Sequence, residues 1–540
     1  MSPAPSRPRT FAAIVASVSA AALGAGVGEL TAAVVAPSAS PFAVIGGGMI
    51  DVAPPWAKDL AIDLFGTGDK VALLVGIALL LLAVAAVAGV VELRRPPWGR
   101  SVLGALGAAG AVVSLTRVDA VMLSPVPSIV AGAVASVVGA VLIARLRRPS
   151  RRADSTSSQD ETAGSPATDA DTLAVSPAAS APADDGVTRR GVLALSGVAV
   201  MAGALAAFGS VALSGGARAI SAVRSALRLP QPATTTTVPD AADLGIDGLS
   251  PVITPSADFY RIDTALVVPQ VDPATWTLRV HGLVEQEVVL RWDDLVALPQ
   301  KETVATLVCV SNEVGGSLIG TARWLGVSIR DILARVKPTA EADMVLSRSV
   351  DGFTASSPLE ALTDDRDALL AIGMNGEPLP IEHGFPVRMV VPGLYGYVSA
   401  TKWVSELEVT RFDRAEGYWT PRGWSERGPV KLQSRIDVPR AGARVEPGST
   451  VIAGVAWHNH VGVAGVEVQI DDGPWQPATL ATAVSADTWV QWSLPWEATS
   501  GLHTARCRAI SADGSTQTSD QAPPAPDGAT GWDEATISVA

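Results

Sequence analysis

Long apolar stretches dominate the first 150 residues of the chain. They are rich in Ala, Val, Leu and Gly, and each is close to the length that crosses a bilayer core of about 30 Å. The four stretches are residues 11–36, 71–92, 101–118 and 127–146. Arginines precede the first, separate the second from the third and follow the fourth. Because basic flanks stay in the cytoplasm, we expect residues 1–148 to form four transmembrane helices with both ends cytoplasmic.

The next hundred residues alternate between polar tracts and one apolar stretch. Residues 149–187 are dominated by Ser, Ala, Pro, Asp and Thr, which predicts a disordered cytoplasmic linker. Residues 188–214 are predicted to be a fifth transmembrane helix, beginning at Arg189 and Arg190. This pair resembles a twin-arginine export signal, or it is the basic flank of the helix. Both interpretations predict a multi-pass protein of the cell membrane, whose extracytoplasmic part follows a linker at 215–250.

After residue 250 the hydrophobic pattern becomes that of globular domains. Residues 251–432 combine alternating, strand-like segments with the helical spacing of apolar residues at 329–336, which predicts an α+β domain. In residues 433–540, short strands of period 2 are separated by Gly and Asp turns, a pattern typical of an immunoglobulin-like β-sandwich. The predicted fold class is multi-domain: an all-α transmembrane bundle, an α+β domain and a β-sandwich.

Composition excludes several classes of function. A mean hydropathy of +0.31 with 17% charged residues is too apolar for a purely soluble protein. A net charge of −13 argues against nucleic acid as a partner, because phosphate binding needs a basic surface. The two cysteines cannot form a disulfide framework, nor an all-thiolate zinc or iron–sulfur site.

Cys309 is the first candidate for chemistry. It follows an apolar, β-branched run and precedes a glycine-bearing turn, which predicts a strand that ends at a cleft. A thiolate there can be a nucleophile or a soft metal ligand, although a buried structural cysteine is the alternative. Cys507 lies on a predicted sandwich strand and is interpreted as core.

A second candidate region runs from residue 383 to 403. His383 and Arg388 flank a Gly-Phe-Pro turn, and Lys402 follows a glycine-rich loop. Glycine loops let backbone N–H groups approach an anion, and an Arg with a Lys can neutralise a phosphate. Either cation alone would be an ordinary surface charge, but together they predict a site for a phosphate-bearing ligand.

Several motifs together resemble the sulfite oxidase family of molybdopterin enzymes. They are Cys309-Val-Ser-Asn, His383-Gly-Phe-Pro-Val-Arg388, Val391-Pro-Gly393, Ser399-Ala-Thr-Lys-Trp403 and Gln433-Ser-Arg-Ile-Asp437. The segments Asp258-Phe-Tyr-Arg-Ile-Asp263 and Met374-Asn-Gly-Glu-Pro-Leu-Pro380 extend the resemblance over roughly 251–540. It implies a molybdopterin domain at 251–432 and a sandwich, often used for dimerisation in the family, at 433–540.

The resemblance also implies the site. Cys309 would ligate the molybdenum of the molybdopterin cofactor and act in catalysis together with Arg261. The implied cofactor-binding residues are Tyr260, Arg261, Ser349, His383, Arg388, Ala400, Thr401 and Lys402. The implied activity is a two-electron oxygen-atom transfer on a small substrate containing sulfur or nitrogen, with a homodimer as a possible assembly.

Two departures from the family bear on the substrate. Sulfite-oxidising members carry an arginine a few residues after the cysteine, where this chain has Glu313 and Val314. They also carry a tyrosine before the Met-Asn-Gly loop, where this chain reads Leu370-Ala-Ile-Gly-Met374. An acidic or apolar wall would repel sulfite, so the substrate stays open, with an S- or N-oxide to be reduced as one candidate.

The positions of the histidines bear on the electron partner. All five histidines lie beyond residue 280, so the membrane helices cannot supply a bis-His haem. No haem is expected in this chain, and electrons would pass to a separate cytochrome or quinone-linked carrier.

Two functions other than a molybdenum oxidoreductase are open. One alternative is a non-catalytic membrane receptor or anchoring protein that retains the fold. The other is a thiol enzyme using Cys309 and His383, which lacks a clear group to orient the histidine.

Overall fold

The computed structural model divides the chain into two units. It describes residues 7–36, 39–52, 69–117, 120–147, 189–213 and 215–540. The described residues up to 213 belong to the first unit, and residues 215–540 belong to the second. The predicted disordered linker at 149–187 lies outside the described residues.

The described part of the first unit is helical. Its helices are α1 (Arg7–Val35), α2 (Pro41–Val52), α4 (Asp69–Arg94), α5 (Trp98–Leu115), α6 (Val126–Arg147) and α7 (Arg189–Leu213). Four of the described helices, α1, α4, α5 and α6, are long and apolar enough to cross a membrane. The described apolar stretch of α7, Gly191–Ala207, is shorter than a span, so a fifth crossing stays a prediction.

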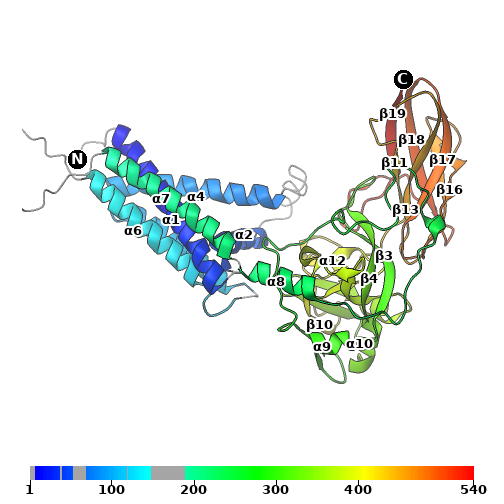
Figure 1. The fold of residues 1–540 in the computed structure, drawn as a ribbon, viewed down its shortest axis with the longest axis horizontal. Helices are drawn as coiled ribbons and strands as arrows, with labels where there is room; N and C mark the ends of the chain where they lie inside the picture. Colours follow the sequence, from blue (N-terminus) through cyan, green and yellow to red (C-terminus); the bar gives the residue numbers. More distant parts are fainter. Residues whose placement is uncertain (1–6, 37–38, 53–68, 118–119, 148–188, 214) are drawn as a thin grey trace, which may run out of the picture. The chain divides into compact units, whose positions relative to one another are not determined.

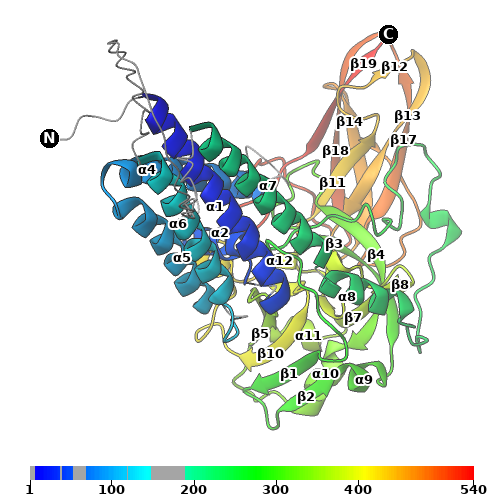
Figure 2. The same cartoon turned by 60° about the vertical axis from the view of Figure 1, so that its left-hand side comes forward.

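Small residues let the helices of this unit approach closely. A Cβ on Gly26 of α1 would lie 2.1 Å from the carbonyl oxygen of Gly203 on α7, and one on Gly107 of α5 would lie 2.7 Å from the Cα of Gly132 on α6. Contacts of this kind are typical of membrane helices, where packing rather than hydrophobicity drives association. Helix α7 therefore packs along α1 as part of the same bundle (Figures 1 and 2).

The second unit begins with two sheets. The first has the order β2-β1-β10-β5-β6, and the second runs β3-β4-β7-β8 with β9 paired to β7. Their strands are β1 (Thr277–Gly282), β2 (Val288–Arg291), β3 (Lys301–Val308), β4 (Ile319–Ser328), β5 (Met344–Ser349), β6 (Thr354–Pro358), β7 (Leu369–Met374), β8 (Glu377–Pro378), β9 (Arg388–Val390) and β10 (Val404–Thr410). The connecting helices are α9 (Trp292–Val296), α10 (Ile329–Val336), α11 (Leu359–Thr363) and α12 (Gly396–Ser399).

One core joins these sheets and their helices. Strands β1 and β10 pair in parallel, whereas β3, β4 and β7 form antiparallel ladders. Helix α10 occupies the range predicted from apolar spacing, begins at the cap Ser328 and buries Ile332 and Leu333 in this core. The α+β class of this region is therefore confirmed.

The C-terminal part of the unit consists of two further sheets around a second core. One has the order β11-β13-β17-β16 and the other β12-β19-β18-β14-β15. Their strands are β11 (Gln433–Val438), β12 (Arg444–Val445), β13 (Gly448–Trp457), β14 (Val463–Ile470), β15 (Gln476–Pro477), β16 (Thr479–Leu480), β17 (Val490–Ala498), β18 (Gly501–Ser511) and β19 (Asp533–Val539). Trp492 of one sheet and Cys507 of the other are fully buried in this core. The region is rich in sheet, and its immunoglobulin-like class stays a prediction.

The segment 215–250, assigned to a linker from its composition, packs on the second unit. Helix α8 (Gly215–Ala226) lies beside β7 and β8 (Figure 2), where Arg224 donates hydrogen bonds to the carbonyls of Pro378 and Leu379. Further along, Thr234 pairs in parallel with Lys301 at the edge of β3. The segment is therefore anchored along the sheet that contains β3, β7 and β8.

Candidate functional site

Cys309 follows β3 directly, as its sequence context predicts. Its side chain is buried, and the turn that holds it is closed by a hydrogen bond from the Cys309 N–H to the Leu318 carbonyl at 2.9 Å. The side-chain oxygen of Asn312 accepts the Leu318 N–H at 2.8 Å, which fixes the far side of the turn. The β3–β4 hairpin thus presents one thiol from a rigid position.

Burial raises the pKa of the Cys309 thiol, although hydrogen bonds from the backbone and hydroxyl of Ser311 act in the opposite direction. On its own, this thiol is therefore protonated at neutral pH and is a weak nucleophile. A bound metal would displace the proton, because metal ligation requires the thiolate. Without a metal the thiol is therefore a poor nucleophile, and its role as a metal ligand stays a prediction.

Arg388 is a buried cation at the start of β9. Its guanidinium donates to the carbonyls of His383 at 3.2 Å and Met389 at 3.3 Å, and lies 5.0 Å from the ring centroid of Trp324. Within the described residues, it forms no ion pair with a carboxylate. Burial lowers the pKa of Arg388 to about 10. A buried charge that lacks a partner is costly, which points to an anion supplied by a ligand.

Tyr260 lies near enough to both the thiol and this guanidinium to feel their charges. Burial raises the pKa of the Tyr260 phenol, the Cys309 thiol acts in the same direction, and the charge of Arg388 opposes both. The ring stacks on Phe259 with centroids 5.2 Å apart. Phe259 in turn packs edge-on against Trp324 and His383. These aromatic rings form one wall beside Cys309 and Arg388.

Lys402 contributes a second buried cation. Its Nζ donates to Oδ2 of Asp263 at 2.6 Å and to the Glu382 carbonyl at 3.0 Å. The same Asp263 oxygen accepts from Nε of Arg261 at 3.0 Å. Burial lowers the pKa of Lys402 to about 8, while Asp263 opposes this shift. Lys402 and Arg261 therefore share one buried carboxylate, and Glu382 is a second acidic side chain whose charge acts on His383.

The His383 ring is neutral at physiological pH in this environment. Burial lowers the pKa of His383 to about 4, and the charges of Arg388 and Lys402 act in the same direction. Within the described residues, no hydrogen bond links its ring to Cys309. The arrangement therefore does not support a thiol enzyme that uses this pair, since a catalytic base needs hydrogen-bond reach to its nucleophile.

Gly384 explains how the two buried cations come together. It has a φ of +110°, and a Cβ at this position would lie 3.0 Å from the Cβ of Arg388 and 3.1 Å from that of Lys402. Both contacts are tighter than ordinary van der Waals contact, and the positive φ also favours glycine. The Gly-Phe-Pro turn therefore allows the two cationic segments to pack side by side.

Three other predicted cofactor-binding residues lie near this group. Ala400 ends α12 and is half-buried. Thr401 is fully buried, and its hydroxyl pairs with that of Ser347 at 2.7 Å. Ser349 lies opposite Val404 on β10, and its hydroxyl accepts the Asp351 N–H at 3.4 Å. These three stay predictions, because both hydroxyls have partners within the fold.

Sequence reasoning missed four residues of the site: Asp263, Ser311, Gly384 and Trp324. Asp263 and Gly384 stand within quoted motifs, and Ser311 is two residues after the cysteine, so only their roles were missed. Trp324 lies in the middle of β4 and carried no signal of its own.

A pocket of about 470 Å³ opens beside the cationic group. Its lining includes Phe259, Arg261, Val268, Gln270, Glu382 and His383. On the loop after Cys309, Glu313 is exposed, and the strand β7 is buried along its whole length. The described site thus presents the buried cations Arg388 and Lys402 on one side and an exposed acidic side chain on the cysteine loop.

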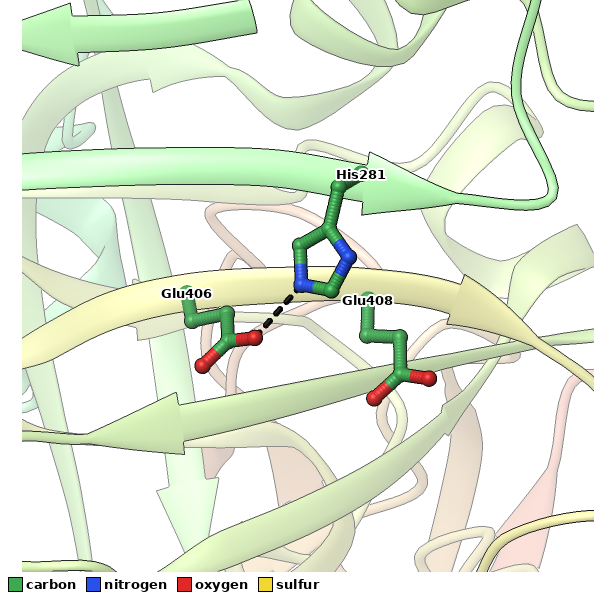
Figure 3. Close-up of side chains that lie close together, drawn as sticks. All are labelled: His281, Glu406 and Glu408. Atoms are coloured by element: carbon green, nitrogen blue, oxygen red, sulfur yellow. Dashed lines mark hydrogen bonds and ion pairs between the residues drawn. The ribbon is translucent and has the colours of Figure 1, made fainter. Parts of the chain in front are cut away.

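A second polar cluster lies on the sheet that contains β1 and β10. His281 of β1 and Glu406 and Glu408 of β10 point from the same face (Figure 3). His281 bonds one oxygen of Glu406 at 2.5 Å, and Arg348 donates to the other at 3.1 Å. Both oxygens of Glu406 are therefore engaged in protein contacts, which link side chains of β1, β5 and β10.

Comparison with known proteins relates this chain to molybdopterin oxidoreductases. A family model described as the oxidoreductase molybdopterin binding domain matches residues 265–419. Mitochondrial sulfite oxidase of Mus musculus is 34% identical over 271 residues, which cover 42% of this chain and 49% of that protein. This chain thus spans about half the length of that relative.

Two relatives are matched over more of their length. Sulfite oxidase of Gallus gallus is 30% identical over 323 residues, covering 50% of this chain and 69% of that protein. The uncharacterized oxidoreductase YuiH of Bacillus subtilis (strain 168) is 36% identical over 157 residues, covering 29% of this chain and 76% of that protein. The range matched by the family model includes Cys309, Arg388 and Lys402.

Proposed function

The chain belongs to the sulfite oxidase family of molybdopterin oxidoreductases, and we propose that it is a membrane-anchored enzyme whose catalytic region lies outside the cytoplasm. Cys309 ligates the molybdenum, and the group of Arg388, Lys402 and His383 holds the phosphate end of the pterin. Tyr260 and Arg261 cover the cofactor. The reaction is a two-electron oxygen-atom transfer on a small substrate that contains sulfur or nitrogen.

The buried, unpaired guanidinium of Arg388 is the observation that carries this proposal. A phosphate monoester bears about −1.5 to −2 charges at neutral pH, and the charges of Arg388 and Lys402 are opposite in sign to it. The Arg388 guanidinium offers a planar donor set that suits phosphate. Without a bound anion, the burial of this charge would only lower the stability of the fold.

The residues around the cofactor have separate roles in this proposal. When bound, the molybdenum centre supplies the oxygen-atom and electron chemistry. Ser311 donates hydrogen bonds that favour the Cys309 thiolate. His383 stays neutral at physiological pH, so it offers a hydrogen bond without adding a third buried charge. Phe259 and Tyr260 exclude water from the thiol side of the site.

The substrate proposal follows from charge. Glu313 is exposed on the cysteine loop, and the Arg261 guanidinium is already paired with Asp263. An anionic substrate would meet the charge of Glu313 and find Arg261 neutralised. We therefore propose that the substrate is an uncharged S- or N-oxide, which the enzyme reduces. Sulfite, which it would have to oxidise, fits the site less well. Electrons come from a separate cytochrome or quinone-linked carrier, and a homodimer through the C-terminal sheets is the proposed assembly.

The test is the molybdenum and pterin content of the full-length protein, made in a host that supplies the cofactor. Wild type should carry about one molybdenum and one pterin per chain. Cys309→Ser should keep the pterin, because the cationic group is intact, but should change the absorption spectrum of the metal centre. Cys507→Ala removes the other thiol, which lies in the C-terminal core, and serves as the control with an unchanged spectrum.

Two other results would contradict parts of the proposed function. Wild-type protein without molybdenum or pterin from such a host would favour a non-catalytic membrane receptor that retains the fold. A Cys309→Ser spectrum identical to that of wild type would remove Cys309 as the metal ligand while leaving the pterin site standing.

A further inference from the structure

The segment 253–276, called the strap below, crosses the site without forming a strand. At its start, Thr254 bonds the backbone of Thr321 at 2.8 Å, and its carbonyl accepts from Asn375 at 3.0 Å. At its end, the indole N–H of Trp276 donates to the Val404 carbonyl at 2.8 Å. The strap is therefore fixed at both ends on different sheets.

The middle of the strap alternates between inward and outward residues. Phe259 is 5% exposed and packs into the wall beside the thiol, whereas Ile262 is 46% and Val267 is 56% exposed. Phe259 therefore supplies hydrophobic burial on one side, while Ile262 and Val267 supply little. Polar contacts add to the hold on this part of the strap.

Asp263 provides a buried polar anchor in that middle part. Its side chain is 4% exposed, and Lys402, its partner at 2.6 Å, lies 139 residues further along the chain. Arg261 binds the same oxygen from the strap side. The carboxylate therefore joins the strap to one of the two cations proposed to bind phosphate.

We infer that Asp263 is a positioning residue, which keeps the strap closed over the pterin and so governs how slowly the cofactor is released. This rests on the proposed function of the site as a molybdopterin pocket. Removing the carboxylate has two opposed effects: the strap loses a buried ion pair, and the phosphate side gains a positive charge. The loss dominates release, because a broken buried pair leaves Lys402 unpaired and strongly favours opening.

The experiment compares Asp263→Asn with wild type as full-length protein in detergent. Trypsin cleavage after Arg261, followed by mass spectrometry of the fragment that begins at Ile262, measures opening of the strap in protein with or without cofactor. The rate of pterin loss after dilution, followed by pterin fluorescence, measures release. The matched control is Asp258→Asn, an exposed carboxylate of the same strap.

Asp263→Asn should raise both rates roughly 10- to 100-fold, as expected when a residue that orients a ligand-binding side chain is lost. Asp263→Glu keeps the charge and should restore most of the slow release, which a purely steric role would not. Asp258→Asn should match wild type. Lys402→Met breaks the same pair from the other side and must also speed cleavage after Arg261; it replaces Asp263→Asn if that variant does not fold.

Two outcomes would overturn the inference. In the first, Asp263→Asn and wild type are cleaved and lose pterin at the same rate. In the second, Asp263→Asn retains pterin longer, because the added positive charge outweighs the lost anchor. Wild-type protein without any pterin would instead refute the proposed function, and the trypsin comparison would still decide whether Asp263 holds the strap.

Discussion

Replacing Arg388 by methionine should stabilise the apoprotein while abolishing retention of the cofactor. The guanidinium is 5% exposed and has no carboxylate partner within the described residues, so the apoprotein carries the cost of an unpaired buried charge. Methionine fills similar space without a charge. The same change removes the planar donor set proposed for the phosphate, so stability and cofactor content should move in opposite directions.

The magnitude follows from the pKa of Arg388. Burial lowers it from 12.5 to about 10, and at about 1.4 kcal/mol per unit of pKa this disfavours the charged form by about 3 kcal/mol. Losing the bonds to the His383 and Met389 carbonyls returns about 1–2 kcal/mol of that. The net gain for the apoprotein is about 1–2 kcal/mol, or roughly 2–4 °C in melting temperature for a large domain.

The assay uses thermal unfolding followed by tryptophan fluorescence, on protein from a host that cannot make molybdopterin. Pterin content is then measured on the same variants from a host that can. Arg335→Met, which removes an exposed arginine on α10, is the control and should change neither quantity. A lower melting temperature for apo Arg388→Met would refute the reasoning, because the guanidinium would then stabilise the fold without any ligand.

Three further outcomes are expected. Gly384→Ala should lower pterin content and destabilise the protein by about 1–3 kcal/mol, because its Cβ would meet those of Arg388 and Lys402 at 3.0 and 3.1 Å; a wild-type melting temperature would contradict this. Since burial lowers the pKa of His383 to about 4, the unfolded chain binds a proton first, and apoprotein stability should fall by up to about 3 kcal/mol between pH 6.5 and 4. His383→Gln should flatten that part of the pH profile, and an unchanged slope would exclude the assigned cause. Glu313→Arg should raise kcat/KM for sulfite about tenfold through charge attraction, whereas equal values would show that the exposed carboxylate does not select the substrate.

The local parts of the fold could be predicted because they depend on neighbouring residues. Four long apolar stretches indicate four membrane-length helices, and the spacing at 329–336 indicates helix α10 with its buried face. The apolar run before Cys309 indicates a strand that ends at the thiol. Each of these signals lies within a window of some thirty residues or fewer, where periodicity and length determine the element.

The electrostatics of the site could not be predicted in the same way. His383, Arg388 and Lys402 suggested a phosphate site from composition, but the absence of a carboxylate partner for Arg388 within the described residues depends on which side chains surround it. Burial is likewise a property of the packed core, and it is the largest cause of the pKa shifts of Cys309, His383 and Lys402.

By itself, the sequence determined the helical character of the first unit, the α+β class of the domain that follows and the residue types of a molybdopterin-type site. Only the tertiary structure decided that Asp263 pairs with Lys402, 139 residues away, and that Gly384 lets Arg388 approach Lys402. It also showed that the segment 215–250 packs on the sheet. Such contacts join positions with no local signal in common, because they form only when distant segments bury their side chains in one core.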